Sequence, residues 1–188
     1  MEFQVLLKNR RSTREFQDKN VPLDILKDII QDSCLAPTSG NGQPCRFVII
    51  RNRAFIKKLS DESKRSYLSD IAKNPTELYK KYENILKLEE FNVFHNAPCV
   101  VFVVGPTAIR SLHVDCALTV AYFMLSATSR GLGTCWIGLG DNIQDPRILE
   151  DMGIPGDCSI VAPIAVGYPV NIPPIAERHA PVIARVIE

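Results

Sequence analysis

The pattern of apolar and polar positions along the chain predicts where helices and strands lie. Apolar residues spaced three and four apart over 3–10 predict a helix with one buried face. Pro22 is expected in the first turn of a second helix, which runs to Cys34. Residues 54–64 have the helical period again. Helices are therefore expected on both sides of a strand at 45–51.

Several apolar runs are too continuous for amphipathic helices and predict strands. The run "CVVFVVG" does not alternate with polar residues, which is typical of a strand buried on both faces. The run "CRFVIIR" is also expected to be a buried strand. The predicted strands cover residues 45–51, 99–105, 134–139 and 159–169.

Capping residues mark two further helices. A helix is expected over 74–91, with Asn74 as the N-cap, Pro75 at the first helical position and Glu77 in a capping box. Asp145 is expected to cap a short helix that ends before Gly153.

The segment 112–125 is apolar on nearly all sides, so we expect a helix inside the fold, ended by Gly131 and Gly133. The tail from Glu177 to Glu188 ends in an apolar, β-prone run. Such an end usually pairs with another segment, and a second subunit is one candidate. The order of elements indicates an α+β or α/β protein with a mainly buried sheet.

Composition excludes several classes of function. The chain has 188 residues and a net charge of +1, which suits one domain and gives no electrostatic footprint for nucleic acid. The N-terminus lacks the residue order of a signal peptide, and prolines interrupt the apolar stretch 158–176. We therefore expect a cytoplasmic protein with no membrane span.

The cysteines and histidines do not suggest a metal site. The six cysteines form no C-x-x-C pair, and we expect reduced thiols packed as small apolar groups. His95, His113 and His179 are isolated, and such histidines are more often structural or surface residues than ligands.

The loop in "LAPTSGNGQPCRFVII" (35–50) is longer than an ordinary helix-to-strand connection, and long loops often carry function. A plain Asn-Gly turn would also account for its residue types. The glycines of "GTCWIGL" have P-loop spacing, but Leu139 stands where the phosphate-binding lysine is required. No nucleophile–base motif is present either, which favours a bound cofactor as the source of the chemistry.

Three stretches together resemble the nitroreductase family of flavin mononucleotide (FMN) enzymes. They are "RRSTREF", "APTSGNGQPCRFVII" and "VDCALTVAYFMLSATSRGLGTCWIG", and the likeness extends from about Lys8 to Pro169 with an interruption between 52 and 92. The resemblance implies an α+β nitroreductase-like fold, in which helices flank a central, mostly antiparallel sheet. It also implies one FMN-binding domain over 1–188 and a homodimer that exchanges its C-terminal strand and holds FMN at the subunit interface.

The resemblance also implies which residues hold FMN. The first motif would bind the phosphate and the ring edge, with Arg14 near the N1–C2=O edge; a basic helix end that faces water is the alternative. The loop of the partner subunit would approach the ring, and the strand end would lie near N5, unless it is simply a core strand. The implied contacts are Arg10, Arg11, Ser12, Arg14, Pro37, Thr38, Ser39, Asn41, Ile137, Gly138, Leu139 and Arg178.

Some positions depart from the family pattern. Cys45 stands where an aromatic residue is common, and Ala176 stands where a lysine is common before Arg178. The segment 60–95 cannot be matched, and neither Lys64 nor Arg65 is assigned a contact, although this segment is expected to shape the acceptor pocket.

By resemblance, the activity would be a ping-pong reaction. NADH or NADPH would reduce bound FMN by hydride transfer, and a small-molecule acceptor such as a nitroaromatic or a quinone would then take two electrons. The alternative is a flavin-binding protein without turnover, either a redox sensor or an FMN carrier.

Overall fold

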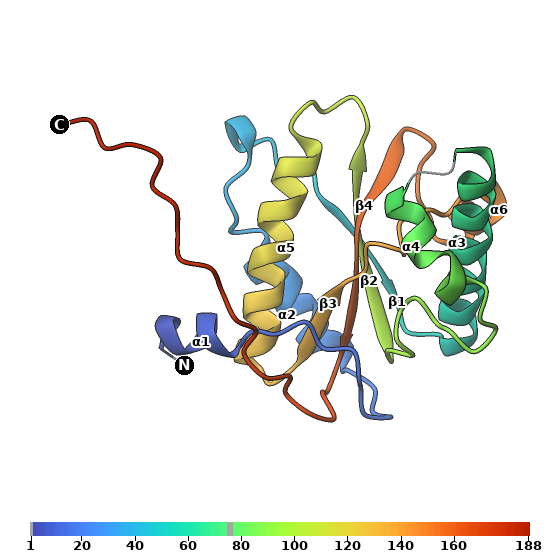
Figure 1. The fold of residues 1–188 in the computed structure, drawn as a ribbon, viewed down its shortest axis with the longest axis horizontal. Coiled ribbons are helices and arrows are strands. Elements are labelled where there is room, and N and C mark those ends of the chain that lie inside the picture. Colours follow the sequence, from blue (N-terminus) through green and yellow to red (C-terminus); the bar gives the residue numbers. More distant parts are fainter. Residues whose placement is uncertain (1, 75–76) are drawn as a thin grey trace.

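The fold is described from a computed structural model that covers residues 2–74 and 77–188. Helices and strands follow in the order expected from the sequence (Figure 1). The elements are α1 (Phe3–Asn9), α2 (Leu23–Ser33), η1 (Ser39–Asn41), β1 (Arg46–Ile50), α3 (Arg53–Lys73), α4 (Glu77–Leu86), β2 (Cys99–Pro106), α5 (Leu112–Ser129), β3 (Gly133–Trp136), α6 (Pro146–Asp151) and β4 (Cys158–Gly167).

The strands form one antiparallel sheet in the order β1-β2-β4-β3. Helices cover both faces: α2 and α5 lie on one side, and α3, α4 and α6 lie on the other (Figure 1). The predicted α+β fold with a central antiparallel sheet flanked by helices is confirmed.

The central strand β2 shows why its apolar run is continuous. Val101 and Val103 pack toward α2 and α5, whereas Val100, Phe102 and Val104 pack toward α3. Both faces of the strand are therefore in a hydrophobic core, and no position is left for a polar residue.

Several expectations about local structure need correction. The strand β1 lies at one edge of the sheet, and its residues are half-buried or exposed rather than buried. The helix expected over 54–64 continues to Lys73. Asn74 ends that helix, since its N–H donates to the carbonyl of Asp70, and the capping role given to Pro75 lies outside the described residues.

The short helix α6 follows the capping argument. The Asp145 carboxylate accepts a hydrogen bond from the backbone N–H of Arg147 at 2.9 Å. The residue Pro22, in contrast, stands just before α2 at the N-cap rather than in the first turn.

Apolar surface remains exposed where burial was expected. The helix α1 has no buried residue, and Phe3 is 61% exposed. The outer side of α5 is also open, with Val114 63% exposed, and Leu118 and Tyr122 lie on the same exposed side. The expectation that α1 buries one face and that α5 lies wholly inside is wrong for one chain, because nothing in the described part of this chain covers these surfaces.

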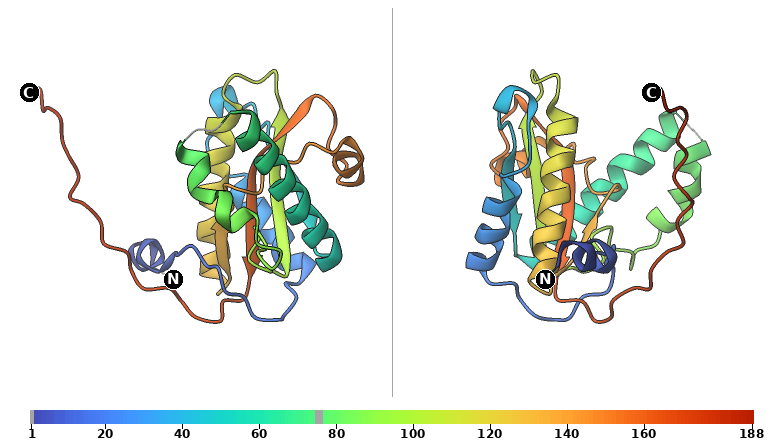
Figure 2. Two further views of the ribbon diagram at one scale, coloured as in Figure 1. Left: turned by 45° about the vertical axis from the view of Figure 1, so that its right-hand side comes forward. Right: turned by 90° about the vertical axis from the view of Figure 1, so that its left-hand side faces the viewer.

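The C-terminal tail leaves the body of the protein. Residues 170–188 extend away from the sheet (Figures 1 and 2), and within the described ranges they belong to no strand. Their apolar side chains are largely exposed, with Val182 at 93%. No helix in the described ranges has the length and hydrophobicity needed to cross a membrane.

Candidate active site

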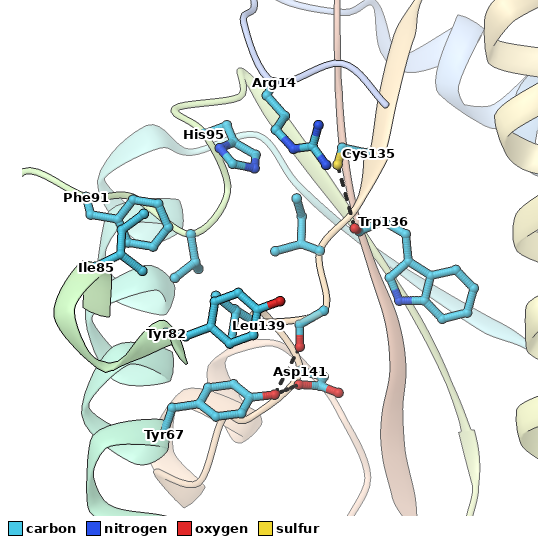
Figure 3. Close-up of a pocket in the computed structure, with 13 residues that line it drawn as sticks. Arg14, Tyr67, Tyr82, Ile85, Phe91, His95, Cys135, Trp136, Leu139 and Asp141 are labelled. Carbon is cyan, nitrogen blue, oxygen red and sulfur yellow. Dashed lines mark hydrogen bonds between the residues drawn. The ribbon is translucent and has the colours of Figure 1, made fainter. Parts of the chain in front are cut away.

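A cavity of about 600 Å³ lies where the chain leaves β3 and passes α3 and α4 (Figure 3). One wall is aromatic and apolar, a second wall is backbone, and a basic group lies at one end. The lining residues are Arg14, Tyr67, Tyr82, Ile85, Phe91, Val93, His95, Cys135, Trp136, Ile137, Gly138, Leu139 and Asp141.

Side chains of α3 hold the backbone wall in place. The Tyr67 hydroxyl donates to Asp141 Oδ1 at 2.6 Å and lies 3.0 Å from the carbonyl oxygen of Gly138. The hydroxyl of Ser63 donates to the carbonyl oxygen of Leu139. The N–H groups of Gly138 and Leu139 donate no hydrogen bond within the described part of the chain. Two backbone donors are thus left for a bound molecule.

Arg14 and His95 lie together at the other end of the cavity (Figure 3). Burial lowers the pKa of His95, and the positive charge of Arg14 acts in the same direction. His95 and Asn96 both have positive φ, at 54° and 52°. This left-handed turn before β2 brings a neutral imidazole into the cavity.

The segment 10–14 runs beside β3. Ser12 pairs with Thr134 in a parallel bridge, and the Thr13 N–H donates to the carbonyl of Thr134 at 2.9 Å. The approach requires Gly133, since an added Cβ there would lie 2.4 Å from Thr13 Oγ1.

Arg14, Arg10 and Ser12 all lie close enough to Cys135 on β3 to influence its thiol. Burial raises the pKa of the Cys135 thiol, while the charges of Arg14 and Arg10 and a hydrogen bond from the Ser12 hydroxyl oppose that shift. Arg10, Ser12 and Arg14 are therefore close to this end of the cavity. Arg11 points elsewhere: it lines a separate hollow with Thr128 and Pro169.

The loop residues predicted to contact FMN lie at the opposite end of the sheet. The Ser39 N–H donates to Asp115 Oδ1 at 2.9 Å, and the loop then passes Gly105, where an added Cβ would lie 3.0 Å from the carbonyl oxygen of Pro44. The Ser12–Thr134 bridge lies at the other end of β2. Thr134 pairs with Val166 of β4, and Val166 pairs with Cys99, the first residue of β2.

The length of β2 therefore separates the loop from Arg14 by roughly 20 Å. One chain brings together Arg14, Ile137, Gly138 and Leu139, with Arg10 and Ser12 beside them. It does not bring Pro37, Thr38, Ser39 or Asn41 to the same cavity. Arg178 belongs to the C-terminal tail, in which it is exposed and part of no helix or strand.

Sequence reasoning missed His95 as a cavity residue, because a single histidine gives no periodic signal. Tyr67, Tyr82 and Phe91 fall within the segment expected to shape the pocket, and all three line it. No group of three metal-ligating side chains occurs among the residues that the structure describes.

Lys64 does not line the cavity and instead holds backbone segments together. Its ammonium group donates to the carbonyl oxygens of Leu88, Glu89 and Phe91 at 2.8, 3.3 and 3.0 Å. These bonds hold the chain after α4 against α3. Arg65, which is exposed, pairs with the buried carboxylate of Glu62 on the same helix.

We expect Lys64→Met to lower the free energy of unfolding by roughly 1.5–3 kcal/mol, because the three backbone carbonyl groups would lose the buried ammonium group that donates to them. Lys57→Met on the same helix is the control, since Lys57 makes only an exposed ion pair with Asp61 and should cost less than about 1 kcal/mol. Urea unfolding measures both. Equal midpoints for the two variants would refute the structural role of Lys64.

Comparison with known proteins identifies the fold and then the family. The chain has the fold of a nitroreductase from Bacteroides fragilis that was solved with bound FMN; the TM-score is 0.82 at 24% identity, over 100% of this chain and 98% of that chain. The model of the nitroreductase family matches residues 7–168. The chain belongs to the nitroreductase family, as the motifs indicated.

Curated relatives within this family have different activities. A 4-nitrobenzoate reductase from Nocardioides sp. is 26% identical over 94% of this chain and 84% of its own length. A 5,6-dimethylbenzimidazole synthase from Rhodospirillum rubrum is also 26% identical, over 89% of this chain and 82% of its own length. The family is therefore defined, whereas the reaction must be argued from the site.

Proposed function

We propose that this protein is a homodimeric FMN-dependent oxidoreductase. In this proposal NADH or NADPH is the electron donor, and a nitroaromatic, quinone or similar small molecule is the acceptor in a ping-pong reaction. Membership of the nitroreductase family, the reductase among its relatives and the FMN bound to a protein of the same fold support the proposal.

The cavity beside Arg14 is the observation that carries the proposal. Its volume of about 600 Å³ is typical of small-molecule sites. Its aromatic side chains suit a flat ring system, and the N–H groups of Gly138 and Leu139 suit acceptor atoms at the ring edge. The guanidinium of Arg14 suits an edge that becomes negative on reduction. The residues present therefore fit FMN.

Each predicted contact has a defined task in the proposal. Bound FMN supplies hydride acceptance and donation. Arg10, Ser12 and Arg178 would bind the phosphate, since guanidinium groups form paired, charge-assisted bonds with phosphate oxygens. Arg11 lines a separate hollow in one chain, so it would join this phosphate site only after its side chain turns. Arg14 would stabilise negative charge on the ring, and Ile137, Gly138 and Leu139 would orient it.

A second copy of the chain would complete the site. The loop with Pro37, Thr38, Ser39 and Asn41 lies about 20 Å from Arg14 within one chain, so it would reach the cavity of the partner instead. The exposed apolar faces of α1 and α5 and the extended tail offer the surface for such a dimer. The proposal treats residues 1–188 as one domain.

Anaerobic reduction tests the catalytic part of this proposal. The flavin absorbance of the purified protein should bleach within seconds after addition of NADH or NADPH and return after addition of a quinone or a nitroaromatic. Bound flavin that neither nicotinamide bleaches would indicate a flavin carrier or sensor and would refute the enzyme.

A further inference from the structure

Two thiols lie in contact between the loop that leads into β1 and the buried side of α5. Cys45 Sγ is 3.4 Å from Cys116 Sγ, although the two residues are 71 positions apart in sequence. Cys45 is half-buried, and Cys116 is fully buried. A disulfide bond is about 2.05 Å long, so the sulfur atoms would have to approach by only about 1.4 Å. The proposed flavin chemistry does not use these thiols.

The two thiols are not equivalent. The hydrogen bond between the two thiols is the main cause that lowers the pKa of Cys45 to about 7, and Thr119 acts in the same direction against the opposing effects of burial and Asp115. The same hydrogen bond, together with burial, raises the pKa of Cys116. The lowered pKa and the greater exposure of Cys45 make it the thiol that reacts first with an oxidant from solvent.

We propose that Cys45 and Cys116 form a redox-active dithiol that small-molecule disulfides of the glutathione type oxidise to an intramolecular disulfide. The Cys45 thiolate attacks one sulfur of the small disulfide, which forms a mixed disulfide and expels one thiolate. Cys116 then loses its proton to solvent and attacks Cys45 Sγ, which expels the second thiolate. Two protein thiols lose two electrons in total, and one small disulfide becomes two thiols.

The contact also explains the order of the two steps. Once Cys45 is in a mixed disulfide, its sulfur carries no charge, and the hydrogen bond that most raises the pKa of Cys116 is lost. Cys116 is then easier to deprotonate, and it already lies next to the sulfur that it attacks. Cys34 is the nearest competitor, but burial and the charge of Cys45 raise its pKa.

A Cys45–Cys116 disulfide would bind the loop to α5 at a second point. Ser39 is already held by Asp115, the residue next to Cys116. Oxidation would therefore restrict the loop between Ser39 and Cys45. Because the loop would contact the flavin of the partner, this restriction would change the affinity for flavin. That effect rests on the proposed function, whereas the thiol chemistry itself is independent of it.

Peptide mapping of the full-length protein tests the proposal. The protein is equilibrated with graded ratios of reduced to oxidised glutathione, quenched in acid, alkylated with N-ethylmaleimide and digested. We expect a Cys45–Cys116 cross-link that dithiothreitol reverses, while Cys158 remains alkylated. A Cys34–Cys45 cross-link, or glutathione on the exposed thiols without a Cys45–Cys116 cross-link, would overturn the proposal.

Cys116→Ala removes the thiol that attacks the mixed disulfide, so glutathione should remain attached to Cys45. Cys158→Ala is the matched control, because it removes a thiol outside the pair and should leave the cross-link unchanged. Both variants are compared by circular dichroism, and the wild-type map remains decisive if Cys116→Ala does not fold. A cross-link in FMN-free protein that never binds flavin would support the dithiol and refute only the proposed function.

The reactivity of Cys45 should depend on pH. We expect its alkylation by iodoacetamide to accelerate with a midpoint at about pH 7, since the thiolate reacts and its fraction rises above the pKa. In Cys116→Ala the midpoint should move upward, because the hydrogen bond that stabilises the thiolate is gone. An unchanged midpoint in that variant would show that Cys116 does not activate Cys45.

Discussion

Replacing Arg14 by alanine is expected to weaken FMN binding by roughly 30- to 150-fold. The Arg14 side chain lies in the cavity beside His95 and Cys135, and a hydrogen bond to a charged group contributes about 2–3 kcal/mol in such a site. Titration of flavin-free protein with FMN, followed by quenching of flavin fluorescence, measures the dissociation constant.

Two variants make the Arg14 test specific. Arg14→Lys keeps the charge but loses the planar fork, so its affinity should lie between those of wild type and Arg14→Ala. Arg147→Ala is the control, because Arg147 is an exposed residue of α6 and does not line the cavity. Wild-type affinity in Arg14→Ala would contradict the placement of the flavin in this cavity.

Deletion of residues 180–188 is expected to convert the proposed dimer largely into monomer. The tail exposes Val182, Ile183, Val186 and Ile187, and burial of four such side chains on a partner contributes up to roughly 6–12 kcal/mol per tail. Light scattering at micromolar concentration measures the mass. We also expect the truncated chain to retain less FMN, since the loop of the partner would no longer be held at the cavity.

A full-length variant separates apolar burial from the mere presence of the tail. Replacing Val182, Ile183, Val186 and Ile187 by serine keeps the length but removes the apolar surface, so this variant should dissociate like the truncation. Glu177→Gln is the control in the same segment. A stable dimer in both the truncation and the serine variant would show that the tail is not exchanged.

Helices and strands could be predicted where a neighbouring side chain caps the element or where a continuous apolar segment is buried on both faces. The cap at Asp145 and the continuous apolar run of β2 gave the correct elements, because a side-chain hydrogen bond and burial on both faces leave direct patterns in the sequence. The edge position of β1 could not be predicted, since it depends on the order of strands in space.

The candidate site was only partly predictable. Ile137, Gly138 and Leu139 follow one strand, so the motif places them together. His95 enters the cavity through a left-handed turn, and no repeat in the sequence signals such a turn. The exposed sides of α1 and α5 were expected to be buried, because the hydrophobic pattern alone does not distinguish a face in the core from an apolar face that the chain leaves exposed.

The most direct test of the account is the flavin content of the purified full-length protein. The protein is soaked in FMN, desalted exhaustively, and its visible spectrum is compared with its concentration. We expect about one FMN per chain, and we expect its loss in an Arg10→Ala/Arg14→Ala double variant that remains folded by circular dichroism. A folded but colourless wild-type protein would contradict the flavin site and the function proposed from it.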